Sequence, residues 1–310
     1  MTFGSFDAIC TKAAFPLCSV VGSVEKNPYF SRGIVPTCYA QSVDLANTLI
    51  FQIGNAFIQF GGIIIVLVII FNVRAKYTAI GRSEMLSFFY IIISLLVSTL
   101  VVDCGVSPPS SGSYAYFVAL QIGLASAACI CLLYNGLLCF QFWEDGTKTS
   151  KWLLRIISGS WFAVNFIISL LTFKSWNTML NPNDTTALFV VSYVLNAAIL
   201  FIYFISQVIL VKFALQNLWL LGALILSVIF FIVGQICCYV ISLQICNGTD
   251  HYLDGLFFGS LGNVFSIMMI YKFWDMITSD DLEFSVATVE NSVNTFGQDD
   301  EKRNSTFFLQ

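Results

Sequence analysis

Few residues of this chain have the types and spacing that catalysis or metal binding requires. The one histidine, His251, lies at a loop edge beside Asp250 and Asp254. These three side chains could ligate a metal ion, although polar residues in such a place are more often simply solvated. Spacings of the HExxH, GxSxG, CxxC and P-loop types are absent from the 310 residues. The sequence therefore predicts no catalytic residue, no cofactor and no resident metal.

Cysteine is the other residue type with reactive chemistry, and the ten cysteines divide into two groups. Five lie within long apolar stretches and are expected to pack as small apolar residues: Cys129, Cys131, Cys139, Cys237 and Cys238. Five lie outside these stretches and are candidates for at most two disulfides, with one thiol left over: Cys10, Cys18, Cys38, Cys104 and Cys246. Cys104 and Cys246 closely follow two apolar stretches, so a bridge between them would join two helix ends. The alternative is that both are free.

The elements that carry these residues are seven apolar stretches. The chain is 57% hydrophobic and 10% charged, whereas soluble domains have about 45–50% and about 25%. About 20 apolar residues in a helix cross a bilayer core of about 30 Å. The predicted spans are 47–71, 85–102, 116–143, 153–173, 188–211, 218–243 and 255–271. We therefore expect an all-α membrane protein, a seven-helix bundle over 47–273, with an N-terminal segment over 1–46 and a disordered acidic tail over 274–310.

The distribution of basic residues predicts the orientation of the bundle. One set of loops and span edges holds Arg74, Lys76, Arg82, Lys148, Lys151, Arg155, Lys212 and Lys272, whereas the three loops on the other side hold only Lys174. Basic residues stay on the cytoplasmic side, so the N-terminal segment is expected to be lumenal and the tail cytosolic. Sequons at Asn183 and Asn247 then fall on the lumenal side and are candidates for glycosylation, and the sequon at Asn304 falls in the tail.

The polar groups inside the predicted spans are amides rather than charges. They are Asn55, Gln59, Gln121, Asn135, Asn165, Asn196, Gln207, Gln235 and Asn263. Amides commonly join helices, within one chain or to a partner, and a permeation path is a further alternative. A transporter is expected to have ionisable groups at mid-membrane, and the middle of each span has none.

Small residues recur every four positions in two of the spans. Ala119, Gly123 and Ala127 do so in the third span, and Gly255 and Gly259 do so in the seventh. Such faces allow helix backbones to approach closely, so they are candidates for helix packing or for binding the helices of a partner.

A seven-span receptor would have the same topology. However, the third span is followed by FQFWEDG, without an Asp-Arg-Tyr-like triplet, and the seventh lacks an Asn-Pro-x-x-Tyr element. The common receptor class is therefore not favoured.

The acidity of the chain belongs to its tail. The formal net charge is −4, and the residues from Asp275 onward include eight acidic and two basic side chains, so the charge gives no indication of a nucleic-acid partner. Asp281 and Glu283, and likewise Asp299 and Glu301, form acidic D-x-E patterns that export machinery could recognise. Acidic residues in such a tail are otherwise solubilising.

Several blocks of sequence together resemble one protein family. They are CYAQSVDLANT, KYTAIGRSE, VVDCGVSPPSSGSY, FWEDGT, HYLDGLFFGS, MMIYKFWDM and DDLEF, which run from Cys38 to Phe284, together with Phe6, Cys10 and PLCSV near the start. The blocks are similar to those of the fungal chitin synthase export chaperone family. The resemblance implies a multi-pass protein of the endoplasmic reticulum membrane that helps a chitin synthase catalytic subunit, its client, to fold and leave for the cell surface.

The residues are compatible with that expectation. A membrane chaperone needs helix faces that shelter client helices and a cytosolic signal for vesicle-coat machinery, but it needs little catalytic chemistry. The predicted function is therefore chaperoning of a chitin synthase, in contact with membrane lipid, and not an enzymatic activity. A seven-span receptor or a small-molecule transporter is the alternative.

Overall fold

The computed structural model describes residues 4–22, 33–45, 48–77, 79–109, 111–140, 145–175, 180–215 and 218–278. Within them, seven helices are long and apolar enough to cross a membrane, so the predicted seven-helix membrane fold is confirmed. They are α2 (Ile53–Ala75), α3 (Arg82–Asp103), α4 (Tyr114–Leu138), α5 (Lys148–Lys174), the helix Thr186–Phe213, α8 (Leu218–Tyr239) and the helix Gly255–Thr278.

The fifth of these helices is not uniform. It runs through α6 (Thr186–Phe189), a π-helical segment η2 (Val190–Val194), α7 (Leu195–Ile209) and a second π-helical segment η3 (Leu210–Leu215). Single π-helical turns inside α-helices are rare and occur frequently at functional sites. Two of them in one helix distinguish it from the other six.

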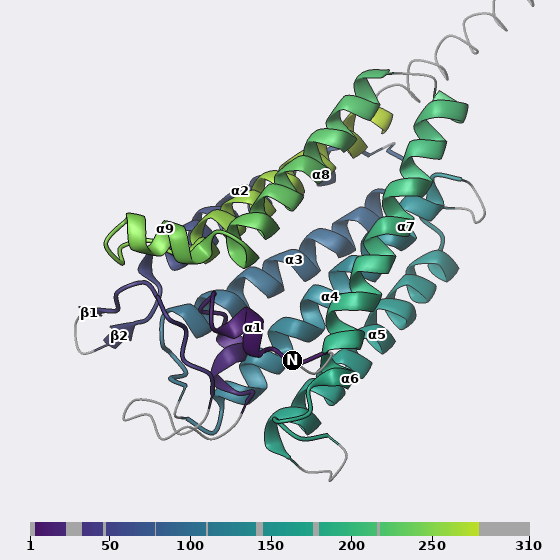
Figure 1. The fold of residues 1–310 in the computed structure, drawn as a ribbon. Helices are drawn as coiled ribbons and strands as arrows, with labels where there is room; N and C mark the ends of the chain where they lie inside the picture. The colour runs from purple at the N-terminus through teal and green to yellow at the C-terminus, as the bar shows by residue number, and fades with distance from the viewer. Residues whose placement is uncertain are drawn as a thin grey trace, which may run out of the picture.

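The helices form a bundle in which α4 packs against α3, α5 and α7, and α2 packs against α3 (Figure 1). Shorter elements gather at one end: α1 (Asp7–Cys10), the 3-10 helix η1 (Pro16–Ser19), the hairpin of β1 (Val43–Leu45) and β2 (Thr48–Ile50), and α9 (Ser242–Gly248). We call this end the cap end. The opposite end carries the eight basic residues named above, and we call it the basic end.

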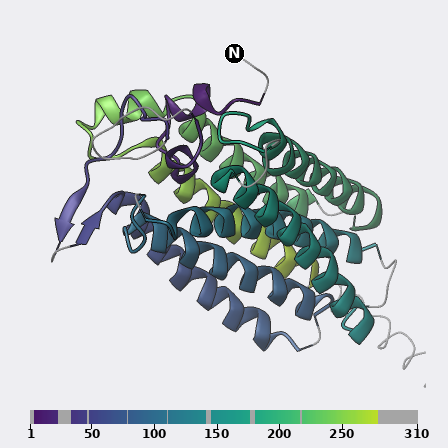
Figure 2. The same ribbon diagram turned by 90° about the horizontal axis from the view of Figure 1, so that it is seen from below.

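The N-terminal segment is packed onto the bundle rather than lying apart from it (Figure 2). Phe6, Leu17 and Val21 are buried in an apolar cluster with residues of α4, α5 and α6, among them Val118 and Leu188. The ring of Phe6 makes edge contacts with those of Phe189 and Tyr193, with centroids 5.7 and 5.5 Å apart. This cluster closes the cap end, while a second and larger apolar cluster fills the bundle toward the basic end.

Two predicted span boundaries are wrong, for different reasons. The first span does not begin at Asn47, because Thr48–Ile50 form β2 and pair antiparallel with β1, with Val43 opposite Ile50. Thr and Ile favour strands, and α2 still spans ~35 Å with its 23 residues. The last helix does not end near Tyr271 but continues to Thr278, beyond the predicted start of the tail at 274.

Two further boundaries move by a few residues. Helix α5 begins at Lys148, five residues before the predicted start, because the side chain of Thr147 accepts a hydrogen bond from Ser150 N and caps the helix. Helix α8 ends at Tyr239, and α9 follows as a separate helix instead of completing the predicted sixth span.

Three glycines allow α8 and the Gly255–Thr278 helix to cross with their backbones in contact. A Cβ added at Gly259 would lie 2.0 Å from Cys238 Sγ, and one at Gly262 would lie 2.8 Å from Phe230 O. A Cβ at Gly234 would lie 3.1 Å from Gly259 O. The two backbones touch here because none of the three glycines has a side chain.

Gly259→Ala is therefore expected to destabilise the folded chain by about 1–3 kcal/mol, the usual effect of overpacking. Gly222→Ala in α8 is the matched control, because nothing lies within 4 Å of its added Cβ. Thermal unfolding in detergent, followed by tryptophan fluorescence, measures both. Equal unfolding temperatures for the two variants would contradict the close crossing.

Candidate functional site

A disulfide ties the start of the chain together at the cap end. Cys10 at the end of α1 is bonded to Cys18 in η1, and both side chains are buried. The bond closes the short loop that brings Phe6 and Leu17 into one apolar cluster. The N-terminal segment therefore has a fixed shape of its own.

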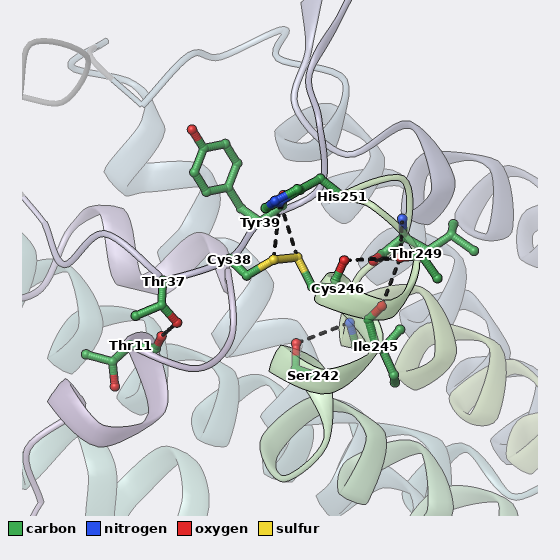
Figure 3. Close-up of a disulfide and its surroundings, with 11 residues drawn as sticks. Thr11, Thr37, Cys38, Tyr39, Ser242, Ile245, Cys246, Thr249 and His251 are labelled. Atoms are coloured by element: carbon green, nitrogen blue, oxygen red, sulfur yellow. Dashed lines mark hydrogen bonds between the residues drawn. A yellow bond between two sulfur atoms is a disulfide. The ribbon is translucent and has the colours of Figure 1, made fainter.

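A second disulfide ties that segment to the far end of the sequence. Cys38 is bonded to Cys246 in α9, across 208 positions of sequence (Figure 3). Of the two alternatives, a bridge between Cys104 and Cys246 is wrong, and so is the alternative that both are free, because Cys246 is bonded to Cys38. Cys104 is a free thiol. Burial, and then the charge of Asp103, raise the pKa of Cys104, so this thiol is a poor nucleophile at neutral pH.

His251 lies against this disulfide rather than in a metal site with Asp250 and Asp254. Its Nδ1 atom is 3.2 Å from Cys38 Sγ, 3.7 Å from Cys246 Sγ and 3.3 Å from Tyr39 O (Figure 3). Asp250 and His251 both have positive φ, 50° and 65°, which turns the chain back after α9. Cys38, Cys246 and His251 have the spacing of metal ligands, but the disulfide consumes both thiols.

The turn after α9 is held by its backbone. His251 N donates to Cys246 O, and Gln41 N donates to His251 O at 2.7 Å. From the sequence alone, His251 could be placed only at the edge of a loop. The HYLDG block was the one available signal that this turn has a defined structure.

At the basic end, Glu84 joins two loops that are distant in sequence. Its carboxylate is fully buried and accepts hydrogen bonds from Ser150 Oγ at 2.9 Å, Gly146 N at 3.1 Å and Ser83 Oγ at 2.7 Å. Asp145 Oδ2 in turn accepts from Gly81 N at 2.8 Å. The blocks KYTAIGRSE and FWEDGT, which carry no chemistry separately, meet here.

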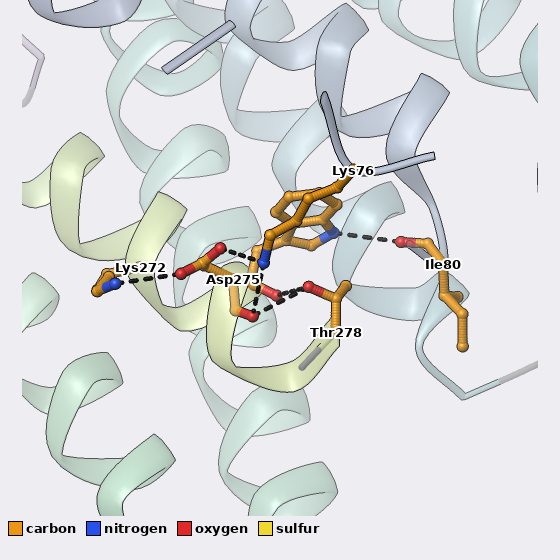
Figure 4. Close-up of polar contacts among 6 residues, drawn as sticks. Lys76, Ile80, Lys272, Asp275 and Thr278 are labelled. Carbon is orange, nitrogen blue, oxygen red and sulfur yellow. Dashed lines mark hydrogen bonds and ion pairs between the residues drawn. The ribbon is translucent and has the colours of Figure 1, made fainter. Parts of the chain in front are cut away.

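The end of the last helix is tied to the end of α2 close by (Figure 4). Lys76 and Lys272 both form ion pairs with Asp275, and Trp274 Nε1 donates to Ile80 O at 3.3 Å. The hydroxyl of Thr278 donates to Trp274 O and Asp275 O. The predicted boundary at 274 is wrong because the charges that mark it, Lys272 and Asp275, are paired within the structure and the helix continues past them.

The small-residue faces are internal. Ala119 and Ala127 are buried, and a Cβ at Gly123 would lie 2.9 Å from the ring of Phe162 in α5. A Cβ at Gly255 would lie 2.4 Å from Cys237 O. These faces pack against the chain's own helices, so the interpretation as free client-binding surfaces is not supported.

The buried amides also make contacts within the chain. Asn196 donates to Ser126 Oγ at 2.7 Å and accepts from Trp161 Nε1 at 3.1 Å, which joins α7 to α4 and α5. Gln207 donates to Gly136 O, and Gln235 donates to Asn263 Oδ1. These amides therefore join helices within the chain.

The remaining predicted residues are divided between the cap end and the undescribed tail. Asn183 and Asn247 are exposed at the cap end, as acceptors of glycosylation must be. Asn304 and the D-x-E residues Asp281, Glu283, Asp299 and Glu301 lie outside the described residues.

Loss of the Cys38–Cys246 bond is expected to destabilise the chain by about 2–5 kcal/mol, because the bond closes a very long loop. Cys38→Ser, Cys246→Ser and the double variant should unfold at the same reduced temperature, since each lacks the same bond. Cys104→Ser is the control and should unfold as the unmodified chain does. An additive loss in the double variant would show that the two cysteines act separately.

Comparison with known proteins identifies close relatives. The sequence pattern of a family described as "Chitin synthase export chaperone" matches residues 2–288. A protein of that name from Candida albicans is 68% identical over 310 residues, which cover 99% of this chain and 100% of the relative. One from Debaryomyces hansenii is 67% identical over 308 residues, with 99% and 100% covered. One from Saccharomyces cerevisiae is 50% identical over 302 residues, with 93% and 96% covered. No solved structure matches the chain.

Proposed function

Since this chain belongs to the chitin synthase export chaperone family, we propose that it is a membrane chaperone for the folding and export of a chitin synthase from the endoplasmic reticulum. The observation that carries the proposal is the family match over residues 2–288, together with relatives of that name along nearly the whole chain. Cell-wall chitin synthesis would then depend on it indirectly. The comparisons favour this function over a receptor or a transporter.

The arrangement of the described residues supports a binding rather than a catalytic role. Buried polar side chains in the bundle, such as Asn196 and Gln207, donate to side chains or backbone carbonyls of neighbouring helices, and the carboxylates at the basic end hold loops and helix ends together. A catalytic centre instead needs a nucleophile or a general base open to a substrate. Cys38 and Cys246, two of the cysteines with potential reactivity, are joined in a disulfide, and His251 lies against it.

The helix Thr186–Phe213 offers the largest free surface for a client. It is the least covered of the seven by the rest of the chain, and its outward side chains include Phe201, Ile202, Ile205 and Ile209. The π-helical segments at both of its ends set it apart further. We therefore assign the contact with a transmembrane helix of the client to this face, where lipid otherwise lies.

The lumenal side of the membrane is assigned to the cap end. Both disulfides and both exposed sequons are there, and disulfides persist in oxidising compartments such as the endoplasmic reticulum lumen. The basic end, with its eight Lys and Arg residues, then faces the cytosol. The described part of the last helix reaches Thr278 at the basic end, and Asp281 and Glu283 follow shortly after it in the sequence. We assign them to the cytosolic side, where vesicle-coat machinery would read them as an export signal.

The orientation is tested by glycosylation. Asn183→Gln and Asn247→Gln should each remove a glycosidase-sensitive shift in electrophoretic mobility, because both sequons are lumenal and exposed. Asn304→Gln is the matched control and should change nothing. A sugar on Asn304 would place the tail in the lumen and reverse the assignment.

The function is tested by following the client. In cells that lack this chain, a chitin synthase should be retained and aggregated in the endoplasmic reticulum, and surface chitin should fall as a consequence. The measurement is the solubility and location of the synthase, with an unrelated multi-pass protein as the control. A synthase that stays soluble and reaches the surface while chitin is still lost would contradict chaperoning and require a direct role in synthesis.

The client surface is tested in the same cells with a photo-crosslinking residue at Ile202 or at Val68 of α2. The two positions are 53% and 55% exposed, so they are equally accessible from the lipid. The synthase should be captured from Ile202 and not from Val68. Capture from Val68 alone would move the client surface to α2 and leave the chaperone function unaffected.

A further inference from the structure

Three buried polar side chains meet at the cap end where three transmembrane helices begin or end. Asn55 lies in the first turn of α2, Asp103 is the last residue of α3, and Asp254 directly precedes the Gly255–Thr278 helix. Their exposed fractions are 3%, 2% and 3%. Asn55 Nδ2 donates to Asp103 Oδ2 at 2.6 Å, and the helix end that carries Asp254 packs against the start of α2 at Gly54, next to Asn55.

The approach of α2 to Asp254 is set by a glycine. A Cβ at Gly54 would lie 3.0 Å from Leu253 and 3.2 Å from Phe257, which flank Asp254 on both sides. Phe51 N donates to Asp103 O, so the start of α2 also touches the end of α3. The three helix ends are therefore in direct contact around these side chains.

Several oxygens here are buried without a hydrogen-bond donor. Gln52, Asn55 and Gln59 lie on one face of α2, at positions i, i+3 and i+7, and the side-chain nitrogen of each donates to a protein atom: Ala14 O, Asp103 Oδ2 and Ser260 Oγ. A backbone carbonyl oxygen only accepts, so the nitrogen of Gln52 must face Ala14 O, and an ionised Asp103 likewise requires that the nitrogen of Asn55 face it. Within the described part of the chain, the amide oxygens of all three residues and Asp254 Oδ2 have no hydrogen-bond partner.

Among the described residues, neither carboxylate forms an ion pair with a Lys or Arg side chain. The ion pairs of the described residues lie at the basic end, at Asp275. Asp254 Oδ1 accepts from Phe257 N at 3.3 Å and benefits from the positive end of its helix, but Asp103 stands at the negative end of α3. Two buried carboxylates near each other are costly unless a positive charge neutralises them.

We propose that a calcium ion binds here, held by Asp103, Asp254 and the Oδ1 atom of Asn55. The available atoms are carboxylate and amide oxygens, which hard cations prefer and zinc does not require. Calcium accepts six to eight oxygens in flexible geometry, with water completing the shell, whereas magnesium demands a near-ideal octahedron. Gln52 and Gln59, one turn to either side of Asn55, would contact the ion's water. The ion would fasten α2, α3 and the last helix together at the cap end.

The experiment uses the full chain purified in detergent. Bound metal is measured after equilibrium dialysis against calcium or magnesium, and unfolding is followed by tryptophan fluorescence with added calcium or a chelator. We expect one calcium per chain and an unfolding temperature that rises with calcium and falls with the chelator. Asp103→Asn and Asp254→Asn should weaken calcium binding at least tenfold. Asp250→Asn is the matched control, since Asp250 is exposed and only four residues from Asp254.

Three results would overturn the site. One is an unmodified chain that holds no calcium at millimolar concentration and becomes more stable as the pH falls, which would show a shared proton instead. Another is equal loss of binding in Asp250→Asn, which would show adventitious binding to surface charge. If the Asp103 and Asp254 variants do not accumulate, Asn55→Asp decides: a third carboxylate at a true ligand position tightens calcium binding, and unchanged or weaker binding overturns the assignment.

Discussion

The structure depends on one constraint: inside a bilayer no water is available, so each polar group must find its partner within the protein. Asn196 shows how this organises the bundle. Its amide accepts from Trp161 and donates to Ser126, so one side chain fixes α7 against both α5 and α4. Such contacts are directional, whereas apolar side chains pack against lipid almost as well as against each other. Between α8 and the last helix, close backbone packing at Gly259 and Gly262 adds to the polar contact of Gln235 with Asn263.

The same constraint explains what could be predicted from the sequence. Seven spans follow from composition because a lipid-facing helix must be apolar along its length, and the run of residues in α8 shows this directly. The ends of the helices are less predictable, because they depend on partners far away in sequence. The last helix passes Lys272 and Asp275 since Lys76, about 200 positions earlier, pairs with Asp275. No local pattern contains that information.

The cysteines illustrate the same limit. Their positions outside the spans were sufficient to select Cys10, Cys18, Cys38, Cys104 and Cys246 and to limit the number of bonds to two. Pairing needs the geometry of the N-terminal segment, which folds onto the bundle through Phe6 and Leu17 and carries Cys38 to α9. Cys104 and Cys246 both follow predicted spans, but the sequence does not show that Cys38, rather than Cys104, lies next to Cys246 in the folded chain. Similarly, the spacing of Ala119, Gly123 and Ala127 indicates a packing face but not its partner, which is α5.

These observations bear on how such a bundle can hold a client. The two ends are fastened by disulfides, by Glu84 and by Asp275, so the helix ends have little freedom to open. Asn196, Gln207 and the glycines at positions 123, 255 and 259, which could hold a foreign helix strongly, already make contacts inside the chain. The outer face of the Thr186–Phe213 helix is apolar, and association there rests on van der Waals contact alone. Each residue contributes little to such van der Waals contact, and client helices of many different sequences can make it. A client helix bound in this way would be shielded while it is alone and released once its own polar partners become available, because those bonds are stronger than any that this face can offer.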